Sequence, residues 1–238
     1  MLNEKIDLIL KKYNISNDDK SNFLNIINPI VKHEEFQRRM TSEFLHHGNI
    51  TLGEHIIEDA VVTYLLSKKS KKNINLALAV KIAMLHDLYT VSWQNTEKVI
   101  KEKKFFNKHG FRHPVEAIIN AYNWYPELFK DEYDTKVIID GVIHHMYPLP
   151  VSKFADSKDN ILELKNFESV SNLPQEIKDI IVDSTKRKGL GRISLCRSKY
   201  IEGRIMSKAD KKVSVGQFKN ISSVLALFTG VNKKLERK

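Results

Sequence analysis

The scarcity of residues that interrupt helices is the strongest constraint on this chain. Only 9 glycines and 6 prolines occur among its 238 residues, and these two residue types are the strongest local breaks in regular structure. Between them apolar residues repeat at helical spacing, as at Ile57, Ala60, Val61, Tyr64 and Leu65, with little sign of the alternation that indicates strands. The sequence therefore predicts an all-α fold, with helices at about residues 3–12, 17–31, 34–46, 53–69, 75–88, 94–104, 114–130, 133–146, 174–187, 193–215 and 217–229.

One stretch, residues 150–192, differs in character from the rest. Ser, Asp, Lys and Asn are interleaved from Pro150 to Leu173, and a basic helix end and a turn occupy Lys186 to Arg192. We expect an irregular insertion here, interrupted by the helix at 174–187. The predicted organisation is a single domain over 1–238, with a helical-bundle core at 33–150 and 193–215, the insertion at 150–192 and a C-terminal helix within 217–238.

The charge of the chain is strongly positive, at +10. A field of this sign favours anionic partners such as nucleotides, phosphate esters or nucleic acid, although most lysine-rich faces are only solvated surface. Cys196 is the only cysteine, which excludes an intramolecular disulfide and a cysteine-based zinc site and suits a reducing compartment. The N-terminus lacks the pattern of a signal peptide, and no apolar run is long enough to span a bilayer. We therefore expect a cytoplasmic protein without a membrane partner.

The candidate chemistry lies in the histidines and in two aspartates. All nine histidines fall between His33 and His145. His86 and Asp87 end an apolar helical run, and His55 opens the helix before it, so packing of the two helices would bring the three side chains together. Asp210 lies among small and apolar neighbours, where a carboxylate is costly unless it is paired with a lysine or bound to a cation. Imidazole and carboxylate together suit Mn, Fe or Zn.

These motifs carry a resemblance to a known family. His55, then His86-Asp87, then Asp210 resembles the signature of the HD superfamily of metal-dependent phosphohydrolases. The surrounding segments look like those of a bacterial HD-domain subgroup, over roughly residues 36–150 and the helix around Asp210: His46-His47-Gly48-Asn49-Ile50-Thr51-Leu52-Gly53-Glu54-His55, Leu85-His86-Asp87-Leu88-Tyr89-Thr90-Val91-Ser92-Trp93, His109-Gly110-Phe111-Arg112-His113-Pro114 and His145-Met146-Tyr147-Pro148-Leu149. The connection between His145 and Asp210 is longer than this resemblance implies.

The resemblance implies a ligand set. His55, His86, Asp87 and Asp210 match the core metal ligands, and His113 with His144, His145 or both matches the additional histidines of members that hold two metals. Of the adjacent pair we prefer His145, because the Met-Tyr-Pro-Leu sequence follows it. Pro114 at a first helical position would make His113 a helix cap, so that His109 and His113 need not share a helix face. One or two divalent ions are expected, Mn, Fe, Zn or Ni, with Mg as a further candidate.

Catalytic roles follow from the chemistry of phosphate-ester hydrolysis. Asp87 has two oxygens with which to bridge two ions. His47 and His109 are candidates to protonate the leaving group, and Arg112 and Lys211, with Arg38 and Arg39, are candidates to bind phosphate. Ordinary surface or hydrogen-bonded roles are the alternative for each of these side chains. The aromatic residues near these motifs would either stack on a nucleotide base or pack in the hydrophobic core; they are Tyr89, Trp93 and Tyr147.

The sequence is compatible with three hypotheses about function. The first is a hydrolase of a phosphomonoester or phosphodiester, with a nucleotide as the expected small substrate. The second is a catalytically silent HD-like module that binds a nucleotide or nucleic acid, and the third is a helical interaction protein with incidental histidines. A homo-oligomer is compatible with each. The sequence contains no glycine-rich phosphate loop of the form G-x-x-x-x-G-K-S/T and no G-x-S-x-G elbow.

Overall fold

The computed structural model describes residues 2–90, 108–154, 170 and 172–217, apart from the side chain of His47. In these residues the protein is mostly helical, which confirms the all-α prediction. The helices are α1 (Leu2–Lys12), α2 (Asn17–Val31), α3 (Glu34–Arg39), α4 (Leu52–Lys69), α5 (Leu76–Leu85), α7 (His109–Trp124), α8 (Glu132–Ile143), α9 (Gln175–Lys186) and α10 (Ile201–Gln217), with short 3-10 helices at Ser42–Phe44 and Pro126–Phe129. None of the described helices is long and apolar enough to cross a membrane.

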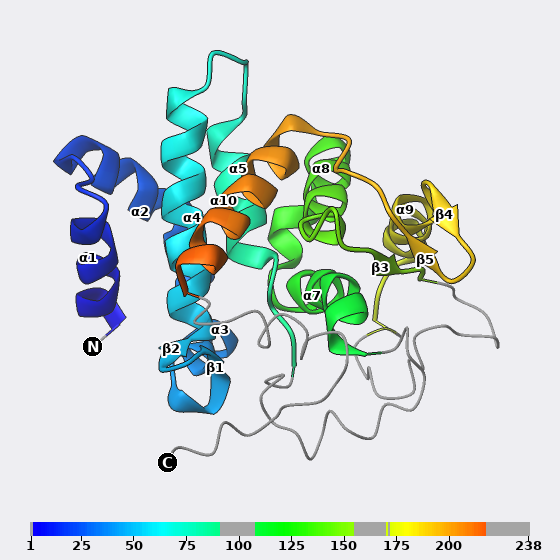
Figure 1. The fold of residues 1–238 in the computed structure, drawn as a ribbon, viewed down its shortest axis with the longest axis horizontal. Helices are drawn as coiled ribbons and strands as arrows, with labels where there is room; N and C mark the ends of the chain where they lie inside the picture. The colour runs from blue at the N-terminus through cyan, green and yellow to red at the C-terminus, as the bar shows by residue number, and fades with distance from the viewer. Residues whose placement is uncertain (1, 91–107, 155–169, 171, 218–238) are drawn as a thin grey trace.

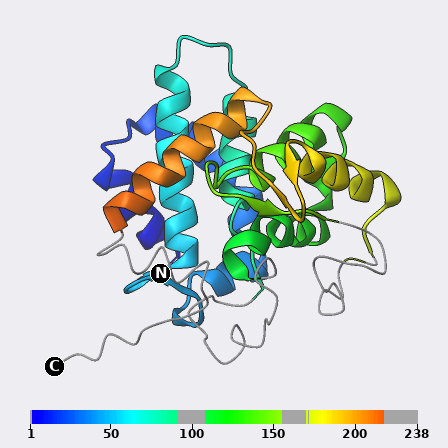
Figure 2. The same ribbon diagram turned by 45° about the vertical axis from the view of Figure 1, so that its right-hand side comes forward.

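Helix α4 lies at the centre of the fold. It packs against α5, and α10 lies across α4, α5 and α8 (Figure 1). Helices α1 and α2 cover one end of the molecule, while α9 lies at the opposite end, and the second view keeps this arrangement (Figure 2). Most residues of α4 are buried, as expected for a helix with neighbours on several sides.

Local sequence signals fix where the two central helices begin. Thr51 and Glu54 form a capping box at the start of α4, in which each side chain binds the backbone N–H of the other residue. The side chain of Asn75 accepts a hydrogen bond from the N–H of Leu78 and caps α5. His55 lies in the first turn of α4, and His86 directly follows the last residue of α5, so both candidate ligands lie at helix ends.

The predicted helix at 34–46 is too long. Helix α3 ends at Arg39, and strands β1 (Leu45–His47) and β2 (Ile50–Thr51) form a hairpin. Its turn is Gly48-Asn49, with Gly48 at a φ of +63°, a conformation that glycine adopts without strain. A Gly-Asn pair is a two-residue hairpin signal, and it outweighs the helical periodicity here.

The described residues of the insertion contain more regular structure than predicted. Strand β3 (Val151–Ser152) pairs with β5 (Ile193–Ser194), which also pairs with β4 (Gly189–Leu190), so that the two ends of the insertion meet in one antiparallel sheet. Helix α9 confirms the helix predicted within it. The predicted helix at 193–215 begins only at Ile201, because β5 and an extended segment precede it. The helices predicted at 94–104 and 217–229 lie outside the described residues, except for Gln217.

Candidate metal centre

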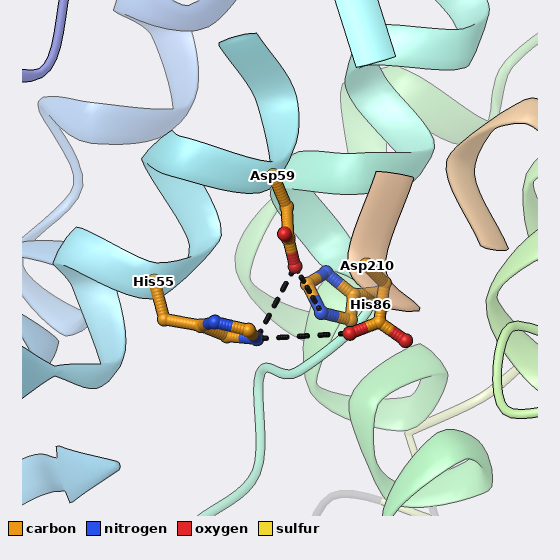
Figure 3. A group of neighbouring side chains, drawn as sticks. All are labelled: His55, Asp59, His86 and Asp210. Atoms are coloured by element: carbon orange, nitrogen blue, oxygen red, sulfur yellow. Dashed lines mark ion pairs between the residues drawn. The ribbon is translucent and has the colours of Figure 1, made fainter. Parts of the chain in front are cut away.

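The first half of the site lies between α4, α5 and α10. His55, Asp59, His86 and Asp210 point toward one another from these three elements (Figure 3). The Nε2 atoms of His55 and His86 lie 3.2 Å and 3.3 Å from Oδ2 of Asp59, and Oδ1 of Asp210 lies 3.9 Å from Nε2 of His55. All four residues are buried.

Packing of α10 on α4 brings Asp210 to this cluster. Val62 on α4 packs against Ala209 and Val213 on α10, one residue before and three after Asp210. The Ser214 hydroxyl donates a 3.0 Å hydrogen bond to Oδ1 of Asp210. A lysine ion pair was the alternative for this carboxylate, and the described residues provide none, since the Lys211 ammonium donates to the Ser207 hydroxyl at 2.6 Å instead.

The carboxylate of Asp87 lies between two groups of histidines. Its Oδ1 lies 3.3 Å from Nε2 of His113 and 3.6 Å from Nε2 of His145. Its Oδ2 lies 3.6 Å from Nε2 of His86, 3.8 Å from that of His55 and 3.9 Å from that of His46. Asp87 thus connects the α7–α8 side of the site with the α4–α5 side.

Backbone carbonyls set the proton positions of three of these histidines. Nδ1 of His86 lies 2.7 Å from the Ala83 carbonyl, Nδ1 of His145 lies 2.7 Å from that of Val142, and Nδ1 of His113 lies 3.0 Å from that of His109. A carbonyl oxygen can only accept, so Nδ1 is the donor in each ring and Nε2 presents a lone pair to the centre. A carbonyl that accepts from Nδ1 fixes the orientation of the ring, as is usual for histidines that bind metal through Nε2.

Several of these groups lack a hydrogen-bond partner. Nε2 of His113 and Nε2 of His145 are 3.2 Å apart, so two lone pairs face each other when both rings are neutral. Both carboxylate oxygens of Asp59, Oδ1 of Asp87 and Nε2 of His86 have no hydrogen-bond partner although they are fully buried. Buried acceptors without donors are costly, and bound cations are partners that such acceptors suit.

The pKa shifts of these residues also favour a bound cation. Burial raises the pKa of Asp87 to about 6, against an opposing effect of His113, and raises the pKa of Asp59 and of Asp210. Burial lowers the pKa of His86, His113 and His145. Neutral imidazoles are competent ligands, and clustered carboxylates that resist ionisation are stabilised by a nearby cation. The residues therefore fit a divalent metal ion.

A cavity of about 210 Å³ opens onto the centre. Five of the predicted ligands line it, with His46 and His109 and with residues of the loop after α8 and of α10: His46, His55, Asp87, His109, His113, His145, Met146, Pro148, Leu149, Asp210, Lys211, Ser214 and Val215. A small ligand in this cavity would therefore contact the candidate metal ligands directly.

The structure brings together most of the residues that the sequence singled out. His55, His86, Asp87, His113, His145 and Asp210 form one buried cluster, and their role as ligands stays a prediction. Asp59 and His46 belong to the same cluster and were missed. Asp59 lies one helical turn after His55 on a predicted helix, which was an available signal, whereas His46 reaches the site only because of the β1–β2 hairpin.

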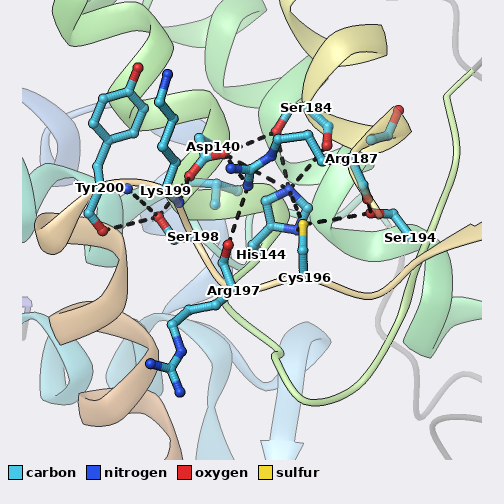
Figure 4. A network of polar contacts seen from close by, with 12 residues as sticks. Asp140, His144, Ser184, Arg187, Ser194, Cys196, Arg197, Ser198, Lys199 and Tyr200 are labelled. Atoms are coloured by element: carbon cyan, nitrogen blue, oxygen red, sulfur yellow. Dashed lines mark hydrogen bonds and ion pairs between the residues drawn. The ribbon is translucent and has the colours of Figure 1, made fainter. Parts of the chain in front are cut away.

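His144 does not join this cluster. It lies in a separate buried network near Asp140, Ser184 and Cys196 (Figure 4). Its Nε2 lies 3.2 Å from the carbonyl of Ser184. Since α8 ends at Ile143 and the chain turns there, consecutive side chains point to different sides, and only His145 faces Asp87.

The prediction that His113 caps a helix is wrong. Helix α7 begins at His109, and Pro114 lies inside it. His109 and His113 share a helix face, with ring centroids 4.9 Å apart and planes at 19°. Proline here removes only one backbone hydrogen bond, near the helix start, and the helix tolerates the loss.

The remaining predicted residues are more scattered. Lys211 lines the cavity, whereas Arg112 lies beside Glu116, with Nε 3.9 Å from its carboxylate. Arg39 is buried between the rings of Phe44 and Trp124 and pairs with Glu35, so it is not a phosphate ligand. Arg38 pairs with Glu35 and Glu43 on the surface. The side chain of His47 and all of Trp93 lie outside the described residues.

Comparison with known proteins identifies no relative of this chain. The chain matches no protein-family model, no curated protein and no solved structure. The geometry of the buried cluster and the motifs of the sequence are therefore what indicate the function.

Proposed function

We propose that this protein is a metal-dependent phosphohydrolase that cleaves a phosphomonoester or phosphodiester, with a nucleotide as the expected substrate. The observation that carries the proposal is the position of Asp87, with one oxygen toward His113 and His145 and the other toward His46, His55 and His86. A carboxylate placed between two sets of neutral donors suits a site for two ions. The resemblance of the motifs to the HD superfamily supports the same assignment.

The chain would hold the metal ions with residues from six segments. His46 comes from β1, His55 and Asp59 from α4, His86 and Asp87 from the end of α5, and Asp210 from α10, while His113 from α7 and His145 from the end of α8 supply the other side. When bound, divalent cations lower the pKa of a coordinated water and neutralise charge on phosphoryl oxygens. Because all these residues lie on or next to helices of a packed core, the ligand positions are fixed before substrate arrives.

Two further side chains at the cavity would act on the substrate. Lys211 is a cation in the cavity wall, so its ammonium would bind a phosphate oxygen. Burial, together with His113 and Arg112, lowers the pKa of His109 well below its ordinary value, so its ring is neutral at pH 7. His109 would therefore orient substrate or water as a neutral hydrogen-bonding group, and the leaving group would take its proton from water.

The test is metal-dependent hydrolysis by the full chain. Purified protein should bind Mn, Fe, Zn or Ni, and Mn-loaded protein should hydrolyse p-nitrophenyl phosphate or nucleoside monophosphates. Asp87→Asn should lower kcat by at least about 100-fold, because it removes the charge shared by both halves of the site. Asp183→Asn makes the same chemical change on the exposed face of α9 and is the matched control.

Two results would overturn the assignment. Retention of full activity in Asp87→Asn would place hydrolysis elsewhere. Metal and nucleotide binding without turnover, on a panel of phosphomonoesters, phosphodiesters and cyclic dinucleotides, would leave the protein as a binding module rather than an enzyme.

A further inference from the structure

A second hollow adjoins the metal cavity. It has a volume of about 350 Å³ and shares Pro148 and Lys211 with the first. Its walls come from the loop after α8, the segment before α10 and α10 itself: Tyr147, Pro148, Arg197, Arg204, Ser207, Lys208 and Lys211. We call it the basic groove.

The basic groove concentrates positive charge. Arg204, Lys208 and Lys211 recur at spacings of four and three residues, so they lie along one face of α10, and Arg197 joins them from the preceding segment. Like charges at these spacings destabilise a helix. Among the described residues no carboxylate lines the groove, and none pairs with these four cations. The groove therefore carries a net positive potential, which attracts anions.

Three of the cations are held in place by neighbouring groups. The guanidinium of Arg197 lies 5.5 Å from the ring centre of Tyr147 and points away from the Asp140 network (Figure 4). Arg204 donates from Nε to the Ser198 carbonyl at 2.8 Å and from Nη2 to that of Lys199 at 2.9 Å. Lys211 donates to the carbonyl of Ser207, whose hydroxyl in turn donates to the carbonyl of His145. These bonds order the cations without neutralising them, which lowers the entropic cost of binding an anion.

We propose that the basic groove binds a second phosphate of the substrate, so that the natural substrate carries two or more linked phosphate groups. This rests on the proposed function, since the reacting phosphoryl group would lie at Asp87 and the rest of the phosphate chain in the groove. Guanidinium forks and ammonium groups are the side chains that bind phosphate most strongly. Hydrolysis would add one water across the P–O bond at the centre. The water oxygen bonds to phosphorus, the bond between phosphorus and the leaving oxygen breaks, and the leaving oxygen takes a proton from that water.

The binding test needs no turnover. Metal-stripped full-length protein is titrated calorimetrically with inorganic tripolyphosphate and with orthophosphate. The wild type should bind tripolyphosphate at least about tenfold more tightly than orthophosphate, and Arg197→Gln/Lys208→Gln should lose about tenfold or more, the effect of one or two charge-assisted hydrogen bonds. Lys71→Gln/Lys72→Gln, an equal charge change between α4 and α5, is the control. An equal loss in the control, or no preference for tripolyphosphate, would overturn the proposal.

The kinetic test uses the Mn-loaded protein. In Arg197→Gln/Lys208→Gln, kcat/KM for a nucleoside triphosphate should fall at least about tenfold more than kcat/KM for p-nitrophenyl phosphate, which has no second phosphate. Equal losses on the two substrates would show that the groove does not bind a second phosphate, without contradicting the proposed hydrolase activity. If tripolyphosphate binding depends on Arg197 and Lys208 but the protein hydrolyses no substrate, the proposed activity is wrong and the phosphate-binding role of the groove stands.

Discussion

Asp59 lies one helical turn after His55 on α4, and its Oδ2 is 3.2 Å from Nε2 of His55 and fully buried. The carboxylate has no hydrogen-bond donor, and burial together with Asp210, Asp87 and Glu58 raises its pKa. A neutral residue of the same shape would remove this cost from the metal-free protein. With a metal bound, the same carboxylate would be a source of stability.

Asp59→Asn should therefore have effects of opposite sign in the two states. At pH 8 we expect the metal-free variant to be more stable than the wild type by about 1–3 kcal/mol, the desolvation penalty of a buried polar group. The gain in thermal midpoint on adding Mn should shrink. Scanning calorimetry with and without Mn measures both, and Asp183→Asn, which is exposed, should change neither. A metal-free variant that is less stable than the wild type would contradict this account of Asp59.

The sequence predicted only part of this site, and Asp59 is one of the residues it did not predict. Packing of two consecutive helices predicted that His55 would lie beside His86 and Asp87, whereas the place of Asp210 in the same site followed from the resemblance to the HD superfamily. Asp59 was missed because an aspartate inside a helix is usually a surface residue. Only the packing of α10 and α5 against α4 shows that this position is enclosed.

Other features depended on tertiary contacts that no local pattern contains. The segment before α10 is extended because the Ser198 hydroxyl and the Lys199 N–H both donate to Asp140 at 2.7 Å. These bonds come from α8, far earlier in the chain, and they override the helical pattern at 193–200. The separation of His144 from His145 has the same kind of origin, since it depends on where α8 ends.

Tyr89 should affect metal affinity through His46. The hydroxyl of Tyr89 lies 2.9 Å from Nδ1 of His46, and the carbonyl of Tyr89 accepts a 2.6 Å hydrogen bond from Arg39. Tyr89→Phe removes the group that orients this ring, and loss of such a contact typically weakens metal binding about 10–100-fold. Titration of each protein with Mn measures the change. The control is Tyr125→Phe, which removes a buried hydroxyl that donates to the carbonyl of Ile30. This variant should bind Mn with the affinity of the wild type. Equal affinities in all three proteins would place His46 outside the ligand set.

Metal binding should depend on pH through Asp87. Its pKa of about 6 means that below pH 6 the metal must displace a proton from this carboxyl, whereas above pH 6 the carboxylate is ready to bind. Through Asp87 alone, affinity for Mn should therefore fall about fivefold between pH 6 and pH 5 and change little between pH 7 and pH 8. Calorimetry in buffers of different ionisation heat should show proton release at pH 5.5. An affinity that is flat from pH 5 to 6 would contradict this account, because either Asp87 would already be ionised at pH 5 or it would not bind the metal.

His144 should make the fold sensitive to acid independently of the metal centre. Burial lowers its pKa to about 4, with Arg187 acting in the same direction and Asp140 opposing. The folded state therefore resists a proton that the unfolded chain accepts below about pH 6.5, so this contribution to stability is present above that pH and is lost as the pH falls toward 4. Between pH 7 and 5 the wild type should lose about 2 kcal/mol of unfolding free energy that His144→Gln does not lose. Urea titrations across this range measure the two slopes; parallel curves would show that His144 is protonated inside the folded protein, with Asp140 as its partner.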